Sequence, residues 1–302
     1  MNRLISCALA SLALLSVTAS ASLVDITSRF NVFVAEDFES ISDAAGRIAA
    51  GGDVTVSPYT IGGATNDGID HNYSLISGGS VTFADGEVWN GGIFANGNVD
   101  LNRCAVYGDV DANGLINGNG TVHGISTSNA GLISPVDFSA VYTELLSISQ
   151  NLASMDASGD VFVNGTSITF DGTGETGAFT IFEVSGSDLA KATSLSLDVG
   201  EDEVAIINVS GTSTATGWTG FNGFIPENVL FNFYESEELS IHSLSGSILA
   251  PKADVSGEWG QLLGGLYAES FKGSEQFHLH PFEHNPPTNV PEPATVVLLG
   301  TG

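Results

Sequence analysis

The stretch GGIFANGNVDLNRCAVYGDVDANGLI, residues 91–116, contains nearly the same pattern twice, 17 residues apart. A glycine, a branched apolar residue and an alanine take alternate positions in both copies: Gly91, Ile93 and Ala95, then Gly108, Val110 and Ala112. Residues i and i+2 of a β-strand lie on the same face, so Ile93 and Ala95 should both point inward. A unit this short cannot bury a core alone, and the pattern therefore predicts stacked coils of a β-solenoid.

The same pattern occurs in three other places, at residues 46–50, 246–250 and 264–268. The last two copies are 18 residues apart, and the 45 residues between Gly46 and Gly91 would hold two or three further units. Several Asn-Gly pairs supply the turns that such coils need. A glycine-rich β-sandwich, in which the segments are similar by chance, is the alternative that these residues leave open.

One segment, residues 134–155, breaks the β pattern and predicts a long helix. Its apolar residues lie on one face at helical spacing: Phe138, Val141, Tyr142, Leu145, Ile148, Leu152 and Met155. We expect Ser134 to cap this helix, Pro135 to occupy its first turn and Asp137 to complete a capping-box-like pair. The apolar stripe should pack along a flank of the solenoid. Strands are expected after the helix over three segments: 161–169, 179–184 and 204–209.

The first 21 residues have the features of a secretory signal peptide. A short basic start precedes a mostly apolar stretch, Leu4–Val17, and the small residues Ala19-Ser20-Ala21 form a cleavage site, with cutting expected after Ala21. The protein is therefore predicted to be exported. We expect one domain over residues 22–284, followed by a proline-rich linker over residues 285–293.

The charge balance limits the possible partners. The chain has 35 Asp and Glu residues against 7 Lys and Arg, a formal net charge of −28. Such a surface repels nucleic acid and anionic membranes, so neither is expected as a partner. Without residues 1–21, Cys104 is the only cysteine, which excludes an intramolecular disulfide. We expect its thiol to be buried in the repeat.

The C-terminal residues resemble a known sorting signal. Val290, Pro291, Glu292 and Pro293, followed by apolar residues, are similar to the PEP-CTERM motif of exported Gram-negative proteins. In that family a membrane helix and a basic cluster follow the motif, whereas here the apolar run is short, so residues 290–302 are interpreted as a truncated signal. The resemblance implies a sorting protease of the exosortase type. It also implies only transient membrane contact, through the missing part of the C-terminal helix.

Four phrases together resemble the choice-of-anchor A domain: RFNVFVAEDF (29–38), GRIAAGGDV (46–54), GSILAPKADVSGEWGQLLGGLYAESFKG (246–273) and FHLHPF (277–282). That family looks like a relative of ice-binding-type adhesive β-helices, and its members are bacterial surface proteins. The resemblance implies a mainly β fold, namely a triangular β-helix (a β-solenoid) with one long α-helix packed along it. It provides no catalytic residues to transfer to this chain.

Residues 109–114, DVDANG, match the first half of a calcium loop, but Gly120 stands where the bidentate glutamate belongs. We therefore interpret Asp109, Asp111 and Asn113 as a solvated strand face and only as weak metal candidates. Loose calcium binding by the acidic surface is the most that we expect, and no cofactor is predicted.

Two further groups suggest binding sites but are better explained by structure. His278 and His280 would share one strand face, as in a zinc-ligand pair, yet a structural end-cap is the preferred interpretation. Ice binding needs regularly spaced threonines on a flat face. Thr55, Thr82 and the cluster of residues 212–219 do not recur at the coil interval, so ice binding is a minor alternative.

No familiar enzyme motif is present in the sequence. The acidic pairs Asp202/Glu203 and Glu237/Glu238 could imitate the carboxylates of a glycosidase, and an inverting hydrolase of a neutral glycan stays open. We nevertheless expect no enzyme and no catalytic residues.

Three tryptophans, Trp89, Trp218 and Trp259, could stack on sugars if they were exposed. Trp259 is expected to pack in the core, and Trp218 is the better candidate for an exposed contact. The sequence as a whole predicts a secreted, non-enzymatic, adhesin-like protein whose partner is a surface glycan, a matrix component or another cell surface. A carbohydrate-binding or polysaccharide-cleaving β-helix is the alternative.

Overall fold

The structure is a computed structural model that describes residues 22–64, 72–174, 177–200, 202–217 and 219–287. Each copy of the repeated pattern forms one strand of a parallel ladder. β9 (Gly92–Ala95) pairs with β12 (Val110–Ala112), so that Ile93 lies beside Val110 and Ala95 lies beside Ala112. All four of these side chains are fully buried, which confirms the inward register expected from the sequence.

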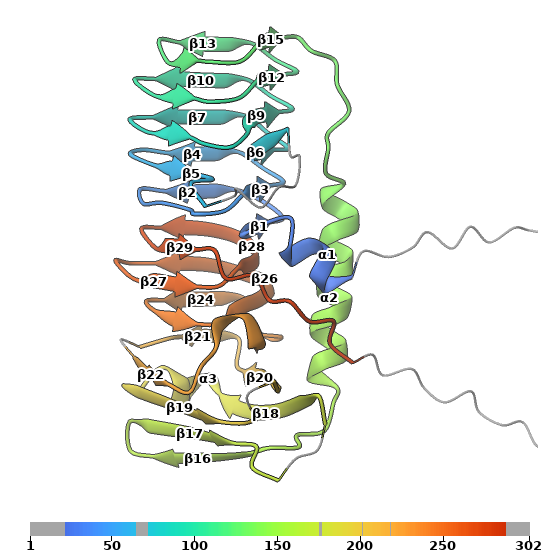
Figure 1. The fold of residues 1–302 in the computed structure, drawn as a ribbon, viewed down its shortest axis with the longest axis vertical. Helices are drawn as coiled ribbons and strands as arrows, with labels where there is room; N and C mark the ends of the chain where they lie inside the picture. The colour runs from blue at the N-terminus through green and yellow to red at the C-terminus, as the bar shows by residue number, and fades with distance from the viewer. Residues whose placement is uncertain (1–21, 65–71, 175–176, 201, 218, 288–302) are drawn as a thin grey trace, which may run out of the picture.

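The ladders form three faces of a β-helix, shown from the side in Figure 1. We call them the helix face, which packs against the long helix α2 (Phe138–Ala153), the groove face, which carries the groove described in the next subsection, and the third face. The helix face contains, from top to bottom, β15 (Ser126–Ser128), β12, β9, β6 (Tyr73–Ser77), β3 (Ile48–Ala50), β1 (Val32–Val34), the first halves of β28 (Leu266–Gly273) and β26 (Ser247–Gly257), β23 (Val229–Asn232), β20 (Val204–Ser210) and β18 (Phe179–Ser185). The groove face contains, in the same direction, β13 (Ile116–Gly118), β10 (Val99–Asn102), β7 (Val81–Ala84), β4 (Val54–Val56), β2 (Phe38–Ser40), the second halves of β28 and β26, β24 (Glu238–Ile241) and β21 (Ser213–Ala215).

The third face is made of shorter strands: β14 (Thr121–Val122), β11 (Ala105–Val106), β8 (Glu87–Val88), β5 (Thr60–Ile61), β29 (Gln276–His278), β27 (Gln261–Leu263) and β25 (Leu244–Ser245). A separate four-stranded sheet forms the lower end: β16 (Asp160–Asn164), β17 (Ser167–Asp171), β19 (Ser194–Asp198) and β22 (Gly220–Asn222). The short helices are α1 (Leu23–Thr27), α3 (Gly186–Leu189) and the 3-10 turn η1 (Pro226–Asn228).

The chain does not wind through the stack from one end to the other. It starts in the middle at β1, rises to β15, returns beside the stack through α2 (Phe138–Ala153), and rises again from β16 to β28 (Figure 1). β28 then pairs with both β1 and β2, the first strands of the upper half. We call this junction the seam. On the third face of the described residues, one isolated bridge crosses the seam, from Ala44 to Phe277, and a second bridge joins Ala44 to Ile61 in the next coil of the upper half.

The core continues across the seam without a break. Phe38 of the upper half and Phe271 of the lower half stack with ring centroids 5.3 Å apart, and Phe277 packs edge-on against Phe271 at 5.1 Å. Elsewhere the coils are so close that side chains are excluded, since a Cβ atom on Gly108 would lie 2.3 Å from the carbonyl oxygen of Gly91. Cys104 is a buried free cysteine, as predicted.

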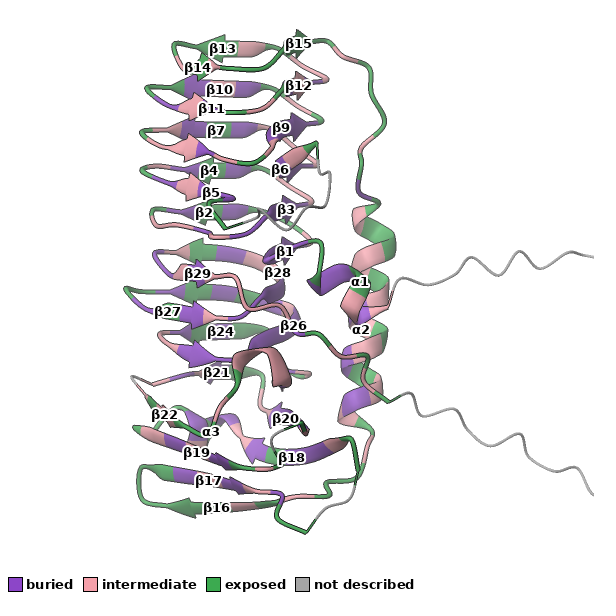
Figure 2. Cartoon of the chain, viewed as in Figure 1, coloured by how far each residue is buried: buried purple, intermediate pink, exposed green. Residues whose placement is uncertain are grey.

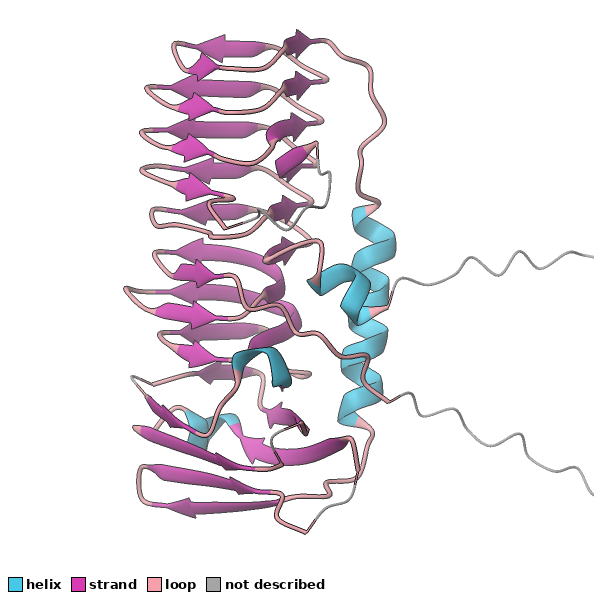
Figure 3. Ribbon diagram, viewed as in Figure 1, coloured by secondary structure: helices cyan, strands magenta, loops and turns pink. Residues whose placement is uncertain are grey.

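The helix α2 covers the outward side of the helix face from about β1 down to β20, and the strands from β6 to β15 lie above its end (Figure 3). Leu145 and Leu152 are fully buried against apolar residues that point out of the ladder, such as Phe33, Leu230 and Leu249. Along α2 the helix face is therefore buried on both sides, whereas β15 at its upper end is exposed and the outward side of the groove face is not covered, as the colouring in Figure 2 shows. Burial on both sides explains why strands such as β1, β20 and β23 read as continuous apolar runs.

A buried polar network joins α2 to the lower half. The Ser149 hydroxyl donates to Asn232 Oδ1 at 2.6 Å, and Asn232 Nδ2 donates to the Ser149 carbonyl oxygen and to Asn208 Oδ1, both at 2.9 Å. Asn208 Nδ2 in turn donates to the carbonyl oxygen of Leu152 at 2.8 Å. Satisfied groups of this kind fix the position of the helix along the stack.

Two local predictions were wrong in detail. The helix begins at Phe138 with Asp137 as its N-cap, because Asp137 Oδ1 accepts the backbone N–H of Ala140, while Ser134 bonds to Val136 instead. The expected strand over residues 161–169 is the hairpin β16–β17, whose turn contains Gly165 with a left-handed φ of 63°. The Asn164-Gly165 pair between the two apolar runs is a hairpin signal that the sequence does contain.

Candidate functional site

The outward side chains of the groove face form one straight column that crosses the seam: Ala215, Ser240, Ser256, Lys272, Glu39, Thr55, Thr82, Asp100 and Asn117. Thr55 and Thr82 do not recur at the 17- or 18-residue interval, yet they are direct neighbours on adjacent coils, because the coil between them is longer. The row stops after these two residues, because Glu39 and Asp100 flank them. Thr214, from the other threonine cluster, is buried.

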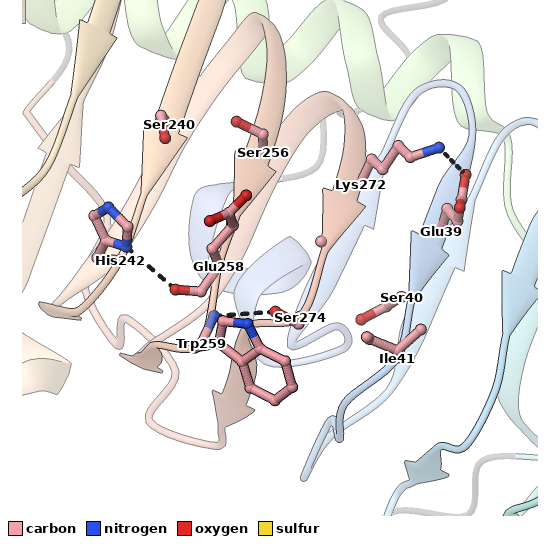
Figure 4. A pocket seen from close by; sticks show the side chains of 12 residues that line it. Glu39, Ser40, Ile41, Ser240, His242, Ser256, Glu258, Trp259, Lys272 and Ser274 are labelled. Carbon is pink, nitrogen blue, oxygen red and sulfur yellow. Dashed lines mark hydrogen bonds and ion pairs between the residues drawn. The ribbon is translucent and has the colours of Figure 1, made fainter.

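A groove with a volume of about 680 Å³ lies where this column crosses the seam. It extends over the four adjacent coils of β24, β26, β28 and β2. Its lining combines the strands of the groove face with the corner that leads to the third face: Glu39, Ser40, Ile41, Ser240, His242, Ser256, Gly257, Glu258, Trp259, Lys272, Gly273 and Ser274. Coils from the beginning and from the end of the sequence, which meet at the seam, therefore contribute to one site (Figure 4).

Trp259 forms the rim of the groove, and the structure corrects its predicted place in the core. The side chain is 75% exposed, and in Figure 4 the indole ring lies on the same side of the groove as Ile41. The residue has a left-handed φ of 56°, and its backbone N–H donates to the Ser274 hydroxyl at 3.0 Å. Trp218, the expected exposed contact, lies outside the described residues.

The glycines on both sides of Glu258-Trp259 are required by close contacts. A Cβ atom on Gly257 would lie 2.3 Å from Cγ of Glu275, and one on Gly260 would lie 1.5 Å from the carbonyl oxygen of His242. The phrase GEWG is therefore a tight corner that projects its tryptophan outward. A tryptophan enclosed by glycines is a turn signal, and this signal could have revealed the exposed residue in the sequence.

Glu275 lies buried beneath this corner. Its side chain is fully buried. The backbone N–H groups of Gly260 and Glu258 point toward the carboxylate, but neither carboxylate oxygen accepts a hydrogen bond of normal geometry. Burial raises the pKa of Glu275 to about 8, because a charged carboxylate is disfavoured away from water. No feature of the sequence distinguished this glutamate from the exposed ones.

The polar groups of the groove are mostly paired with one another. Lys272 Nζ lies 2.7 Å from Glu39 Oε2, which links the last coil to the first across the seam. His242 Nδ1 lies 3.2 Å from the carbonyl oxygen of Glu258. The lining thus presents hydroxyl groups, one ion pair and one exposed carboxylate beside an exposed aromatic ring.

A second aromatic feature occupies the third face of the upper half. The rings of Trp89 and Tyr107 stack at 4.0 Å, and those of Tyr107 and His123 stack at 4.5 Å, both nearly parallel. Trp89 Nε1 donates to Glu87 Oε2 at 3.2 Å. Since the rings cover one another, Trp89 is mainly part of a ladder that joins three coils.

The weak metal candidates are each engaged by a different neighbour. Asp109 Oδ1 accepts the N–H of Ile125 at 2.8 Å, and Asp111 Oδ2 accepts the Tyr73 hydroxyl at 2.6 Å. Asn113 bonds to the backbone of Leu132 through both side-chain atoms. Asp111 is half-buried by its contact with Tyr73 and is therefore less solvated than expected.

The other candidates also have structural contacts. His280 Nδ1 lies 2.6 Å from Glu227 Oε1, whereas His278 Nε2 is buried without a partner and burial lowers the pKa of this histidine. Within the described ranges, no group of three or more His, Cys, Asp or Glu residues could hold a metal ion.

Neither acidic pair lies in the groove lining. Glu203 accepts hydrogen bonds from Thr180 and from the Gly200 N–H. Glu237 and Glu238 lie exposed at the start of β24, where Glu238 accepts a bond from Ser213 at 3.4 Å. The predicted signal peptide with Ala21, and the sorting motif of residues 290–293, lie outside the described residues. Among the helices that the structure describes, none is long and apolar enough to cross a membrane.

Comparison with protein families gives one match, over residues 23–279, to a family described as "Putative Ice-binding-like adhesive domain". No match was found among curated proteins or among solved structures. The matched region includes every face of the β-helix, the helix α2 and all residues of the groove. The chain therefore belongs to the family of ice-binding-like adhesive domains.

Proposed function

We propose that this protein is a secreted, non-enzymatic, adhesin-like protein of the Gram-negative cell surface or extracellular matrix. Membership of an adhesive-domain family supports the adhesin-like role and a location outside the cell. The partner is a surface glycan, a matrix component or another cell surface. Residues 22–284 act as a single choice-of-anchor A-like domain, and Val290–Pro293 belongs to a PEP-CTERM signal that an exosortase-type protease recognises.

The groove is the observation that carries this proposal. Its exposed groups stand on parallel strands that are packed from within, so the binding surface exists before any partner arrives. Pre-organisation of this kind lowers the entropy cost of binding. The functional residues accordingly act by contact, with Trp259 at the rim as the most exposed large apolar side chain of the contact surface.

The path of the chain supports anchoring at the C-terminal end. The Val24 N–H donates to Asn285 Oδ1 at 3.3 Å, and Thr27 Oγ1 donates to the Phe282 carbonyl oxygen at 2.6 Å, so the two described ends lie together beside the helices. The groove lies on a different face. A tether at the C-terminal end would therefore leave the groove face open to a partner.

The test is retention of the purified protein on isolated envelopes and on extracellular matrix from the producing bacterium. We expect saturable retention, with no release of reducing sugar during prolonged incubation. Absence of retention on every surface would overturn the adhesin-like function. Steady release of reducing sugar would overturn its non-enzymatic character.

A further inference from the structure

We propose that the groove binds an uncharged oligosaccharide, with the indole ring of Trp259 stacked on the face of one sugar ring. This inference rests on the adhesin-like function proposed above, and it names the class of ligand and the residues that hold it. It follows from the distribution of apolar groups, hydroxyl groups and charge within the groove.

The groove is divided into an apolar part and a hydroxyl-rich part. Trp259 and Ile41, which are 75% and 53% exposed, lie on the same side of it (Figure 4). The remainder is polar, with the hydroxyl groups of Ser240 and Ser256 and the ion pair of Lys272 with Glu39, and the Ser274 hydroxyl lies beside Trp259. A pyranose ring has the same division, because its C–H groups form an apolar face and its hydroxyl groups project around the rim. Tryptophan suits such a ligand, since one large flat surface can make contact at low entropy cost.

The charges in the groove favour an uncharged ligand. Lys272 is the one lysine or arginine among the lining residues, and its ammonium group is already paired with Glu39, while the imidazole of His242 lies against the carbonyl oxygen of Glu258. The exposed carboxylate of Glu258 adds negative charge, as does the chain as a whole with its formal net charge of −28. An anionic sugar would therefore meet repulsion, and no cation in the lining would offset it.

The left-handed φ of Trp259 belongs to the corner itself, because Asp85 and Arg103 have similar φ values at the equivalent corners of the upper half. What is particular to the lower half is the side chain. A left-handed φ is disfavoured for a bulky side chain, and glycine adopts it freely. Since the Trp259 side chain is mostly exposed, packing contributes little in return, and contact with a ligand would account for a tryptophan at this corner.

The length of the groove indicates the size of the ligand. Its lining residues come from four adjacent coils, and neighbouring strands are about 4.8 Å apart, so the floor is roughly 14 Å long. This length exceeds a single sugar ring and suits a short oligosaccharide. The ligand would cross the seam, touching Ser240 at one end and Glu39 at the other.

The experiment measures binding of neutral tri- and tetrasaccharides by titration calorimetry, using gluco-, galacto- and manno-oligosaccharides and uronic-acid oligomers of the same length. We expect at least one neutral oligosaccharide to bind the wild-type protein, and Trp259→Gly to weaken that binding at least tenfold. The matched control is Arg103→Gly, because Arg103 occupies the same corner in the upper half with a similar φ of 50°. That variant should bind as the wild type does.

Each outcome decides one of the two proposals. Unchanged binding in Trp259→Gly, or binding of uronic-acid oligomers or unrelated peptides alone, would overturn the oligosaccharide site. If no oligosaccharide binds while the protein is still retained on envelopes, the oligosaccharide site falls and the adhesin-like function stands. If oligosaccharides bind but no native surface retains the protein, the adhesin-like function falls instead. Thermal melts of both variants verify that they are folded.

Discussion

One corner of the β-helix, between the groove face and the third face, has the same backbone in both halves of the stack but different side chains. Asp85 and Arg103 in the upper half and Trp259 in the lower half all have left-handed φ values, of 55°, 50° and 56°. In the upper half the two residues neutralise each other, with Arg103 Nη2 at 2.6 Å from Asp85 Oδ2. In the lower half the corner carries a tryptophan directed into the groove. Coils with the same backbone conformation can therefore form either a purely structural part of the stack or a binding site, depending on the side chains at their corners.

The upper half is also the more regular of the two. Along its other corner, a side chain of each coil accepts the backbone N–H of the next. Asp37 accepts that of Asp53 at 2.7 Å, Asp53 accepts that of Ser80 at 2.7 Å, and Ser80 accepts that of Asn98 at 3.1 Å. Such a ladder uses the polar side chains for cohesion between coils. We infer that the upper half supports the seam, whereas the lower half and the seam provide the groove.

The largest expected effect is loss of folding in the regular half. Ala95→Asp and Ala112→Asp each place a carboxylate in a fully buried position of the coil interior. An unpaired buried charge costs several kcal/mol or forces protonation, which is a large part of the roughly 5–15 kcal/mol that stabilises a typical domain. We expect both variants to be insoluble or unfolded, as judged by expression and thermal melts.

The matched controls are Asp109→Asn and Asp111→Asn, at adjacent outward positions. Asparagine keeps the Oδ1 acceptor for the Ile125 N–H and an acceptor for the Tyr73 hydroxyl, so we expect changes within about 0.5 kcal/mol. Mild Ala→Asp variants together with severe Asp→Asn variants would contradict the register and revive a calcium site at Asp109–Asn113.

The sequence predicted the repetitive part of this architecture well and the site poorly, for a physical reason. Inward positions repeat because every coil meets the same neighbours, so Ile93 and Val110 could be placed before the structure was known. The groove depends on contacts between residues such as Lys272 and Glu39, which are 233 positions apart. For its most exposed residue, Trp259, the usual burial of large aromatic residues predicts a place in the core, whereas the glycines on both sides of Glu258-Trp259 indicate a tight corner.

The second effect concerns pH and the lower half alone. The folded protein holds a proton on Glu275 up to about pH 8, whereas the unfolded chain releases it near the ordinary pKa of 4.5. This contribution to stability is therefore complete below about pH 4.5 and falls as the pH rises to about 8, by a few kcal/mol in total. Urea unfolding of the wild type and of Glu275→Gln between pH 4 and 9 measures it.

We expect the difference in unfolding free energy between Glu275→Gln and the wild type to favour the variant progressively as the pH rises. Repulsion among the other acidic residues changes with pH equally in both proteins, so its effect cancels when the two unfolding free energies are subtracted. A difference that stays constant with pH would show that Glu275 titrates normally and is not isolated from water.

The third effect tests how α2 is attached to the lower half. Asn232→Ala leaves Asn208 and Ser149 without one hydrogen-bond partner each in a buried site, which costs about 1–3 kcal/mol for a buried group. Gln150→Ala, on the exposed side of the same helix, is the control and should change stability little. Equal melting temperatures for both variants would mean that apolar packing alone positions the helix.

The smallest effect compares the two left-handed corners directly. Replacing Trp259 by glycine removes a backbone strain of roughly 1–2 kcal/mol, while the freedom gained by the unfolded chain opposes it by roughly 0.5–1 kcal/mol. Little packing is lost from a side chain that is 75% exposed, so Trp259→Gly should melt at the same temperature as the wild type or slightly higher. Arg103→Gly gains the same relief but loses an exposed ion pair worth about 0–1 kcal/mol. Its stability should therefore be no higher than that of Trp259→Gly. A clear destabilisation of Trp259→Gly would show that the tryptophan serves the fold, and the two corners would then differ in packing and not in function.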